Sequence, residues 1–164
     1  MDLTLQDIAQ AGKHYGGLSD IWLAVAADVS SIPDPEDLLV SGNITMQSGK
    51  TFITIVPIDN SITYSGSTNR DGQGIYYDHR LSFDIGKAEL VKELTLAGAS
   101  RKVVAIAEDN NGDQRIIGSE DSPAHLTYGM SKNQGHGGTD RYSASITWKS
   151  KIPALHYTGT IPTS

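Results

Sequence analysis

The chain has 164 residues, of which 38% are hydrophobic and 20% charged, and its formal net charge is −6. This length fits one domain that buries about two thirds of the surface of its unfolded chain, and the composition is that of an ordinary folded protein. The acidic balance argues against a surface that tracks nucleic-acid phosphates, because such affinity depends on lysine and arginine. The chain contains no cysteine, which excludes disulfides and thiolate metal sites.

The first 17 residues are expected to form an N-terminal arm. Leu3, Leu5, Ile8 and Ala9 make a short apolar stripe at helical spacing, and glycines follow it. The arm includes Asp2 and Asp7 but no long apolar run, so it does not resemble a secretory signal. No stretch of the chain approaches the ~18 apolar residues of a membrane span. We therefore expect synthesis in the cytoplasm and no membrane partner.

The main body, residues 18–157, is expected to be a single β-rich domain followed by a polar tail at 158–164. Its apolar or alternating segments are short and are separated by proline, glycine and polar residues, which is typical of strands. The predicted strands cover residues 21–29, 38–40, 44–46, 51–56, 61–64, 76–85, 102–107, 114–117, 125–130, 142–148 and 152–157.

Two turns and two long loops connect these strands in the prediction. Residues 47–50 are polar and predict a hairpin between their flanking strands, and the Asn111-Gly112 pair predicts a second hairpin. The polar segments 65–74 and 131–141 are long enough to be functional loops.

One helix is predicted at residues 87–97. Leu90, Val91, Leu94 and Ala97 fall at helical spacing, and Gly98 is a typical helix terminator. Such a helix would cover one face of a sheet. The expected fold class is therefore mainly β: a β-sandwich or barrel of antiparallel strands with one flanking helix and two long loops.

A calcium-like pattern lies between two of the predicted strands. Asp109, Asn111, Asp113 and Glu120 occupy positions 1, 3, 5 and 12 of the calcium loop of helix–loop–helix proteins. Gln114 stands where that loop needs glycine, and strands flank the segment where helices belong. A solvated hairpin is the favoured interpretation, and no metal or other cofactor is expected.

Other apparent motifs do not support catalysis. Ser48-Gly49-Lys50-Thr51 ends like a phosphate-binding loop, but Ile44 replaces its first glycine and a strand follows. The five histidines have no short metal-ligand spacing, and no Gly-x-Ser-x-Gly elbow presents a nucleophile. No catalytic residue is predicted, and the chain is not expected to be an enzyme.

The C-terminal third resembles small virion proteins of tailed bacteriophages. The residues that carry this resemblance are Gly118-Ser119-Glu120-Asp121-Ser122-Pro123-Ala124, Gly135 to Gly138, Asp140-Arg141, Ser145-Ile146-Thr147-Trp148 and Pro153-Ala154-Leu155-His156-Tyr157. The order strand, long loop, strand, helix, hairpin over residues 51–117 is also similar to the phage tail-tube fold. In that family a β-sandwich or barrel is flanked by one helix, and six subunits form a ring.

The resemblance implies a structural subunit of a virion tail, forming stacked homo-oligomeric rings through which DNA passes during ejection. Other tail or neck proteins would be its partners, and the acidic charge would repel the passing DNA. Within the same resemblance, a neck, tail-terminator or adaptor subunit is an alternative. A different class of function, a monomeric β-rich domain that binds sugar or protein, also remains open.

Four charged residues in the two predicted loops are the candidate contacts between subunits. These are Arg70, Asp71, Asp140 and Arg141, which lie among glycines and could become ordered on assembly. They are equally compatible with solvated loops.

Overall fold

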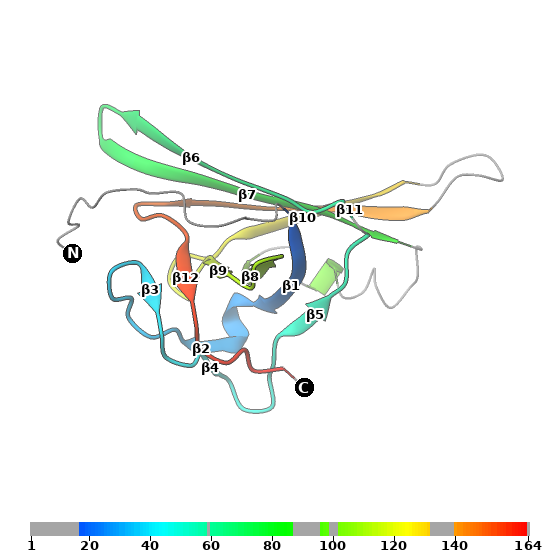
Figure 1. Ribbon diagram of the computed structural model, residues 1–164, viewed down its shortest axis with the longest axis horizontal. Helices are drawn as coiled ribbons and strands as arrows, with labels where there is room; N and C mark the ends of the chain where they lie inside the picture. Colours follow the sequence, from blue (N-terminus) through cyan, green and yellow to red (C-terminus); the bar gives the residue numbers. More distant parts are fainter. Residues whose placement is uncertain (1–16, 59, 87–95, 99–101, 132–139, 164) are drawn as a thin grey trace.

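The computed structural model describes residues 17–58, 60–86, 96–98, 102–131 and 140–163, and these form two packed β-sheets with a small third sheet (Figure 1). The mainly-β prediction is confirmed. The elements in chain order are β1 (Leu18–Val25), the 3-10 helix η1 (Ala26–Asp28), β2 (Val29–Ser31), β3 (Leu39–Val40), β4 (Thr45–Met46), β5 (Ile53–Ile55), β6 (Thr63–Asp71), β7 (Gly74–Gly86), β8 (Val103–Asp109), β9 (Gln114–Ile117), β10 (His125–Ser131), β11 (Arg141–Ser150) and β12 (Leu155–Tyr157).

A six-stranded sheet with the order β3-β12-β9-β8-β1-β5 forms one layer, and a four-stranded sheet with the order β10-β11-β7-β6 forms the other. The neighbouring strands within both sheets are antiparallel except for β12 and β3. The remaining pair, β2 and β4, makes a two-stranded sheet of its own. This layered, sandwich-like arrangement agrees with the expected fold class.

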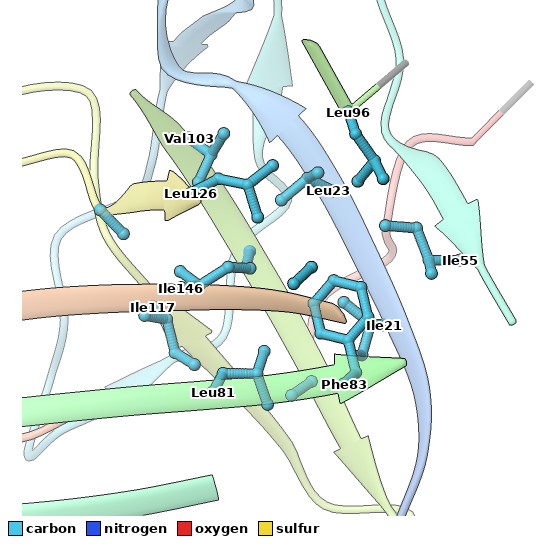
Figure 2. Close-up of a cluster of buried hydrophobic side chains, with 14 of the residues drawn as sticks. Ile21, Leu23, Ile55, Leu81, Phe83, Leu96, Val103, Ile117, Leu126 and Ile146 are labelled. Atoms are coloured by element: carbon cyan, nitrogen blue, oxygen red, sulfur yellow. The ribbon is translucent and has the colours of Figure 1, made fainter. Parts of the chain in front are cut away.

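The main hydrophobic cluster lies between the two large sheets (Figure 2). Alternate residues of β7 point into it: Leu81, Phe83 and Ile85 are buried, and residues between them face outward. Strand β11 contributes in the same way through Tyr142, Ala144, Ile146 and Trp148. The period of two seen in the sequence is thus the reason one face of this sheet is dry and the other polar.

Strand β8 is buried on both faces. Its residues Val103, Ala105 and Ala107 belong to the cluster between the sheets, whereas Val104 and Ile106 belong to a second cluster on the other side of the six-stranded sheet. A continuous apolar run is what a strand covered on both faces requires. Phe52, Tyr157 and the small sheet cover this second side.

The helix is present at its C-terminal end. Residues 96–98 are helical, and Leu96 is buried in the cluster between the sheets. Residues 87–95 of the predicted helix lie outside the described residues. So do residues 1–16 of the expected N-terminal arm and 132–139 of the second long loop.

The prediction of a first long loop at residues 65–74 is wrong. These residues form most of β6, the two-residue turn Gly72-Gln73 and the start of β7. The hairpin extends beyond β11, whose pairing with β7 ends at Tyr77, and it projects past the rest of the molecule (Figure 1). Because water surrounds this projecting part, its residues carry no apolar alternation, and the sequence pattern looked like a loop.

The prediction of a hairpin around residues 47–50 is also wrong. Those residues do turn, with the Lys50 amide donating to the Gln47 carbonyl at 3.0 Å. The strands on either side separate, however, since β4 pairs with β2 and β5 pairs with β1. The hairpin predicted at Asn111-Gly112 is confirmed, because β8 and β9 pair on either side of it.

The segment predicted as a polar tail lies against the domain. The Phe52 amide donates to the Pro162 carbonyl at 2.8 Å, and the Thr160 amide donates to Asn43 Oδ1 at 2.8 Å. Ile161 packs against the second hydrophobic cluster. Residues 158–163 therefore form part of the packed structure.

Candidate functional site

The outward face of the four-stranded sheet is a polar surface, because the residues that alternate with the buried ones point to solvent. Paired residues line up across the strands, so that Ser65, Arg80, Thr147 and His125 form one row and Ser67, Asp78 and Lys149 form the next. A further row contains Thr63, Ser82, Ser145 and Thr127. The face is thus dominated by small hydroxyl side chains with a few charges.

Those charges are largely balanced. Lys149 Nζ lies 3.9 Å from Asp78 Oδ1, and Arg141 Nη1 lies 3.3 Å from Asp84 Oδ2. Arg80 adds a positive charge in the row between Ser65 and Thr147. A depression of about 850 Å³ lies over this part of the sheet and includes Arg80 and His125. The acidic excess of the chain is therefore not located on this face.

An aromatic cluster lies behind the polar face, at one end of the hydrophobic core. His79 is 5% exposed, and its ring stacks on Trp148 with a centroid distance of 5.1 Å and on Tyr64 and Tyr77 at 6.2 and 6.4 Å. The Tyr64 hydroxyl shares a 2.9 Å hydrogen bond with His79 Nδ1. His79 Nε2 is buried and has no hydrogen-bond partner among the described residues.

Burial controls the ionisation of this cluster. Loss of solvent lowers the pKa of His79, and the Ile152 backbone and the Asp78 carboxylate act in the opposite direction. Burial also raises the pKa of Tyr64. Both shifts favour neutral side chains, so the cluster is a packing element with no charge of its own near neutral pH.

Trp148 connects the aromatic cluster to the segment before β10. Its indole Nε1 donates to the Ser122 carbonyl at 2.9 Å. Gly118, at φ +90°, begins this segment, and a Cβ there would lie 2.8 Å from the Ala124 nitrogen and 2.9 Å from the Val103 oxygen. Only glycine fits this close approach, which holds residues 118–124 against β8.

Both outer edges of the four-stranded sheet are free of strand pairing in the described part of the chain. Strand β6 pairs only with β7, and β10 pairs only with β11. Free edges expose backbone donors and acceptors that can pair with another chain. Neither β6 nor β10 contains proline or lysine, residues that commonly block such pairing.

The four predicted contact residues lie at two distant places on this sheet. Arg70 and Asp71 end β6 beside the hairpin turn, where Asp71 Oδ1 accepts from the Gln73 amide at 2.8 Å. Asp140 and Arg141 lie where β11 begins, beside Gly86 at the far end of β7. The four residues therefore do not form one site. Arg141 is engaged by Asp84 within the chain.

The calcium-like residues do not converge either. Asp109 Oδ1 accepts hydrogen bonds from the Asn111 and Asp113 amides at 2.8 and 3.0 Å, as in a side-chain-stabilised turn. Glu120 belongs to a different connection, and its Oε1 accepts from the Ile32 amide at 3.2 Å. In the described ranges, histidine and acidic residues form no group of three or more that could hold a metal ion.

The aromatic cluster was not predicted, because the five histidines were weighed as possible metal ligands or as residues on the surface or on a strand face. The alternation of Tyr77, His79, Leu81 and Phe83 continues one buried face and could have placed His79 in the core. The turn at Ser48-Gly49-Lys50-Thr51 is exposed and is followed by β5, so it lacks the helix of a phosphate-binding loop.

No family model, no curated protein and no solved structure matches this chain. Within the described ranges, no helix is both long and apolar enough to cross a membrane.

Proposed function

We propose that the protein is a non-catalytic structural subunit of a phage tail, and that copies form a ring-shaped tube by pairing the edges of their four-stranded sheets. The observation that carries the proposal is the open edge on each side of that sheet, β6 on one side and β10 on the other. One copy can thus pair with a neighbour on each side, as a closed ring requires.

The strand directions favour a continuous sheet. With four antiparallel strands, the two edge strands β6 and β10 run in opposite directions. When a rotation places a second copy beside the first, β6 of one copy meets β10 of the other in antiparallel orientation. A ring built this way is antiparallel throughout, and it leaves no edge of the four-stranded sheet exposed.

The polar outward face would line the inside of such a ring, since the opposite face is covered by the six-stranded sheet. Its hydroxyl side chains and balanced charges would offer a passing DNA molecule little adhesion. Repulsion by an acidic wall is not part of this proposal, because Asp78 and Asp84 each have a cationic neighbour on the same sheet.

A monomeric sugar-binding or protein-binding domain is the second candidate, favoured by the depression over Arg80 and His125. Sugar sites usually present aromatic rings to the ligand. Here Trp148 is 6% exposed and lies with His79 on the inward face, so the assembly proposal is preferred. A neck, terminator or adaptor subunit would use the same edges with a different partner.

Electron microscopy and light scattering across a concentration series test the proposal. We expect rings or stacked tubes at high concentration, whereas a monodisperse monomer throughout would contradict the tube function. Thr68→Pro is the matched edge variant. The pair that closes a two-residue hairpin turn, here Asp71 and Gly74, is a hydrogen-bonded pair. Hydrogen-bonded and non-hydrogen-bonded pairs alternate along an antiparallel ladder, so the Thr68 amide points to the open edge.

Proline at position 68 removes that amide and should abolish rings while leaving the monomer folded, because proline is tolerated on edge strands. The control is Thr68→Ala, which keeps the amide and should assemble normally. Assembly of the proline variant at the wild-type concentration would exclude β6 as the pairing edge.

A further inference from the structure

A largely apolar groove of about 780 Å³ lies beneath the projecting β6–β7 hairpin. Its apolar lining comes from five elements or connections of the chain: Ile32, Ile116, Trp148, Ile152 and Leu155. Ile152 is 38% exposed. Lys149 borders both this groove and the polar outward face, and Asp71 at the end of β6 also borders the groove.

We propose that the N-terminal segment of the same chain, residues 3–9, binds in this groove through Leu3, Leu5 and Ile8. This inference goes beyond the proposed tube function and does not depend on it. Binding would remove the apolar side chains of the segment and of the groove from water, which is energetically favourable.

The length of chain before the first described residue allows this contact. The Asn110 amide donates to the Gly17 carbonyl at 3.1 Å, so the chain enters the described structure beside the β8–β9 turn. Strand β9 starts after this turn and carries Ile116 into the groove. The eight residue steps from Ala9 to Gly17 span up to ~26 Å when extended, which leaves ample reach along β9.

Charge is also complementary. Lys149 and Lys151 border the groove together with Asp71, so its rim carries two positive charges and one negative charge. Lys149 forms an ion pair with Asp78, and its Nζ lies 5.5 Å from the centroid of the Tyr76 ring. Lys151 is exposed. The segment itself carries Asp7, and Asp2 directly precedes it. A tethered segment with this match needs only weak contacts, because its effective concentration at the groove is high.

Cysteine cross-linking in the full chain tests the inference, since the protein has no cysteine that could interfere. The variant carries Leu5→Cys and Ile152→Cys. Mild oxidation should give a monomer with shifted mobility on a non-reducing gel, reversed by reductant. The control pair, Leu5→Cys with Thr127→Cys, places the second thiol on the outward face of β10 and should not give this product.

Absence of the intramolecular product, or cross-linked dimers in its place, would overturn docking within the same chain. A second readout uses Trp148, which borders the groove and is the only tryptophan once Trp22→Phe is introduced. In that background Leu5→Asp should shift Trp148 emission to the red and increase its quenching by acrylamide. Unchanged emission and quenching, in a variant with a normal melting curve, would equally overturn the proposal.

Discussion

Tyr64 and His79, on neighbouring strands, share a 2.9 Å hydrogen bond over Gly66, the residue paired with His79. A Cβ at position 66 would lie 3.3 Å from His79 Nδ1 and 3.4 Å from the Tyr64 hydroxyl oxygen. The glycine therefore leaves room for the two rings. The rings in turn cover the glycine, which would otherwise weaken this edge strand. This contact links the free edge of the sheet to its core.

The first prediction concerns pH. Because burial lowers the pKa of His79, the unfolded state takes up a proton before the folded state does as pH falls. The stabilising effect of neutral His79 is complete above its unfolded pKa, about 6.5, and is lost as pH falls below it. Urea unfolding at several pH values should show this loss, with a slope of at most about 1.4 kcal/mol per pH unit from this residue.

The control for the pH prediction is His79→Gln, which cannot titrate. Its free energy of unfolding should be lower than that of the wild type at pH 8, and the difference should narrow between pH 6.5 and 5. A constant difference over this range would show that His79 protonation is not coupled to folding.

The second prediction concerns Gly159. A Cβ at this position would lie 2.5 Å from the Gly42 carbonyl oxygen and 2.7 Å from the Tyr157 hydroxyl oxygen. Gly159→Ala should therefore destabilise the protein by about 1–3 kcal/mol, the usual range for overpacking. Thermal unfolding measures the effect. Gly72→Ala, where no heavy atom lies within 4 Å of the added carbon, should be near neutral, and equal losses in both variants would refute the steric explanation.

The third prediction concerns Glu120, whose carboxylate accepts from the Ile32 amide and fixes the chain after β2. Glu120→Ala leaves that amide without its acceptor and should cost about 1–3 kcal/mol. Glu120→Gln retains an acceptor oxygen and should keep most of the stability. Denaturant titration of the two variants distinguishes them, and a harmless alanine variant would mean that water replaces the carboxylate.

The fourth prediction concerns calcium. Asp109 is occupied by the amides of its own turn, and Glu120 is held at Ile32, so the calcium-like pattern should not bind the ion. Adding a chelator should leave the melting temperature unchanged. A rise in melting temperature on titration with calcium would contradict this, because a ligand of the folded state stabilises it by mass action.

The sequence allowed the local features with strong patterns to be predicted, and the reason differs from element to element. The β8–β9 hairpin was predictable because Asn110, Asn111 and Gly112 encode a turn locally, with Gly112 at φ +85°. Strand β8 was predictable from its apolar run. The pairing of β4 with β2 was not, because partner choice between short strands depends on distant residues such as Phe52 and Tyr157.

The candidate site was less predictable than the fold. Strand β6 has the composition of a loop, and its strand conformation comes from pairing with β7, where Asn69 Nδ2 donates to Asp78 Oδ2 at 2.8 Å. Arg70 and Arg141 were grouped as contact residues because both are charged residues within predicted glycine-rich loops. They lie at opposite ends of β7, because Arg70 pairs with Ile75 and Arg141 pairs with Gly86, and the predicted loop had replaced most of β6.

The double-sided burial of β8 has a consequence for how the protein unfolds. Because its alternate side chains belong to both hydrophobic clusters, neither layer can open without exposing apolar surface of the other. We therefore expect one cooperative transition. Trp148 reports on the first cluster and Trp22 packs against the second, so variants that retain a single tryptophan should give coincident melting curves. The two layers of this sandwich would thus behave as a single folding unit.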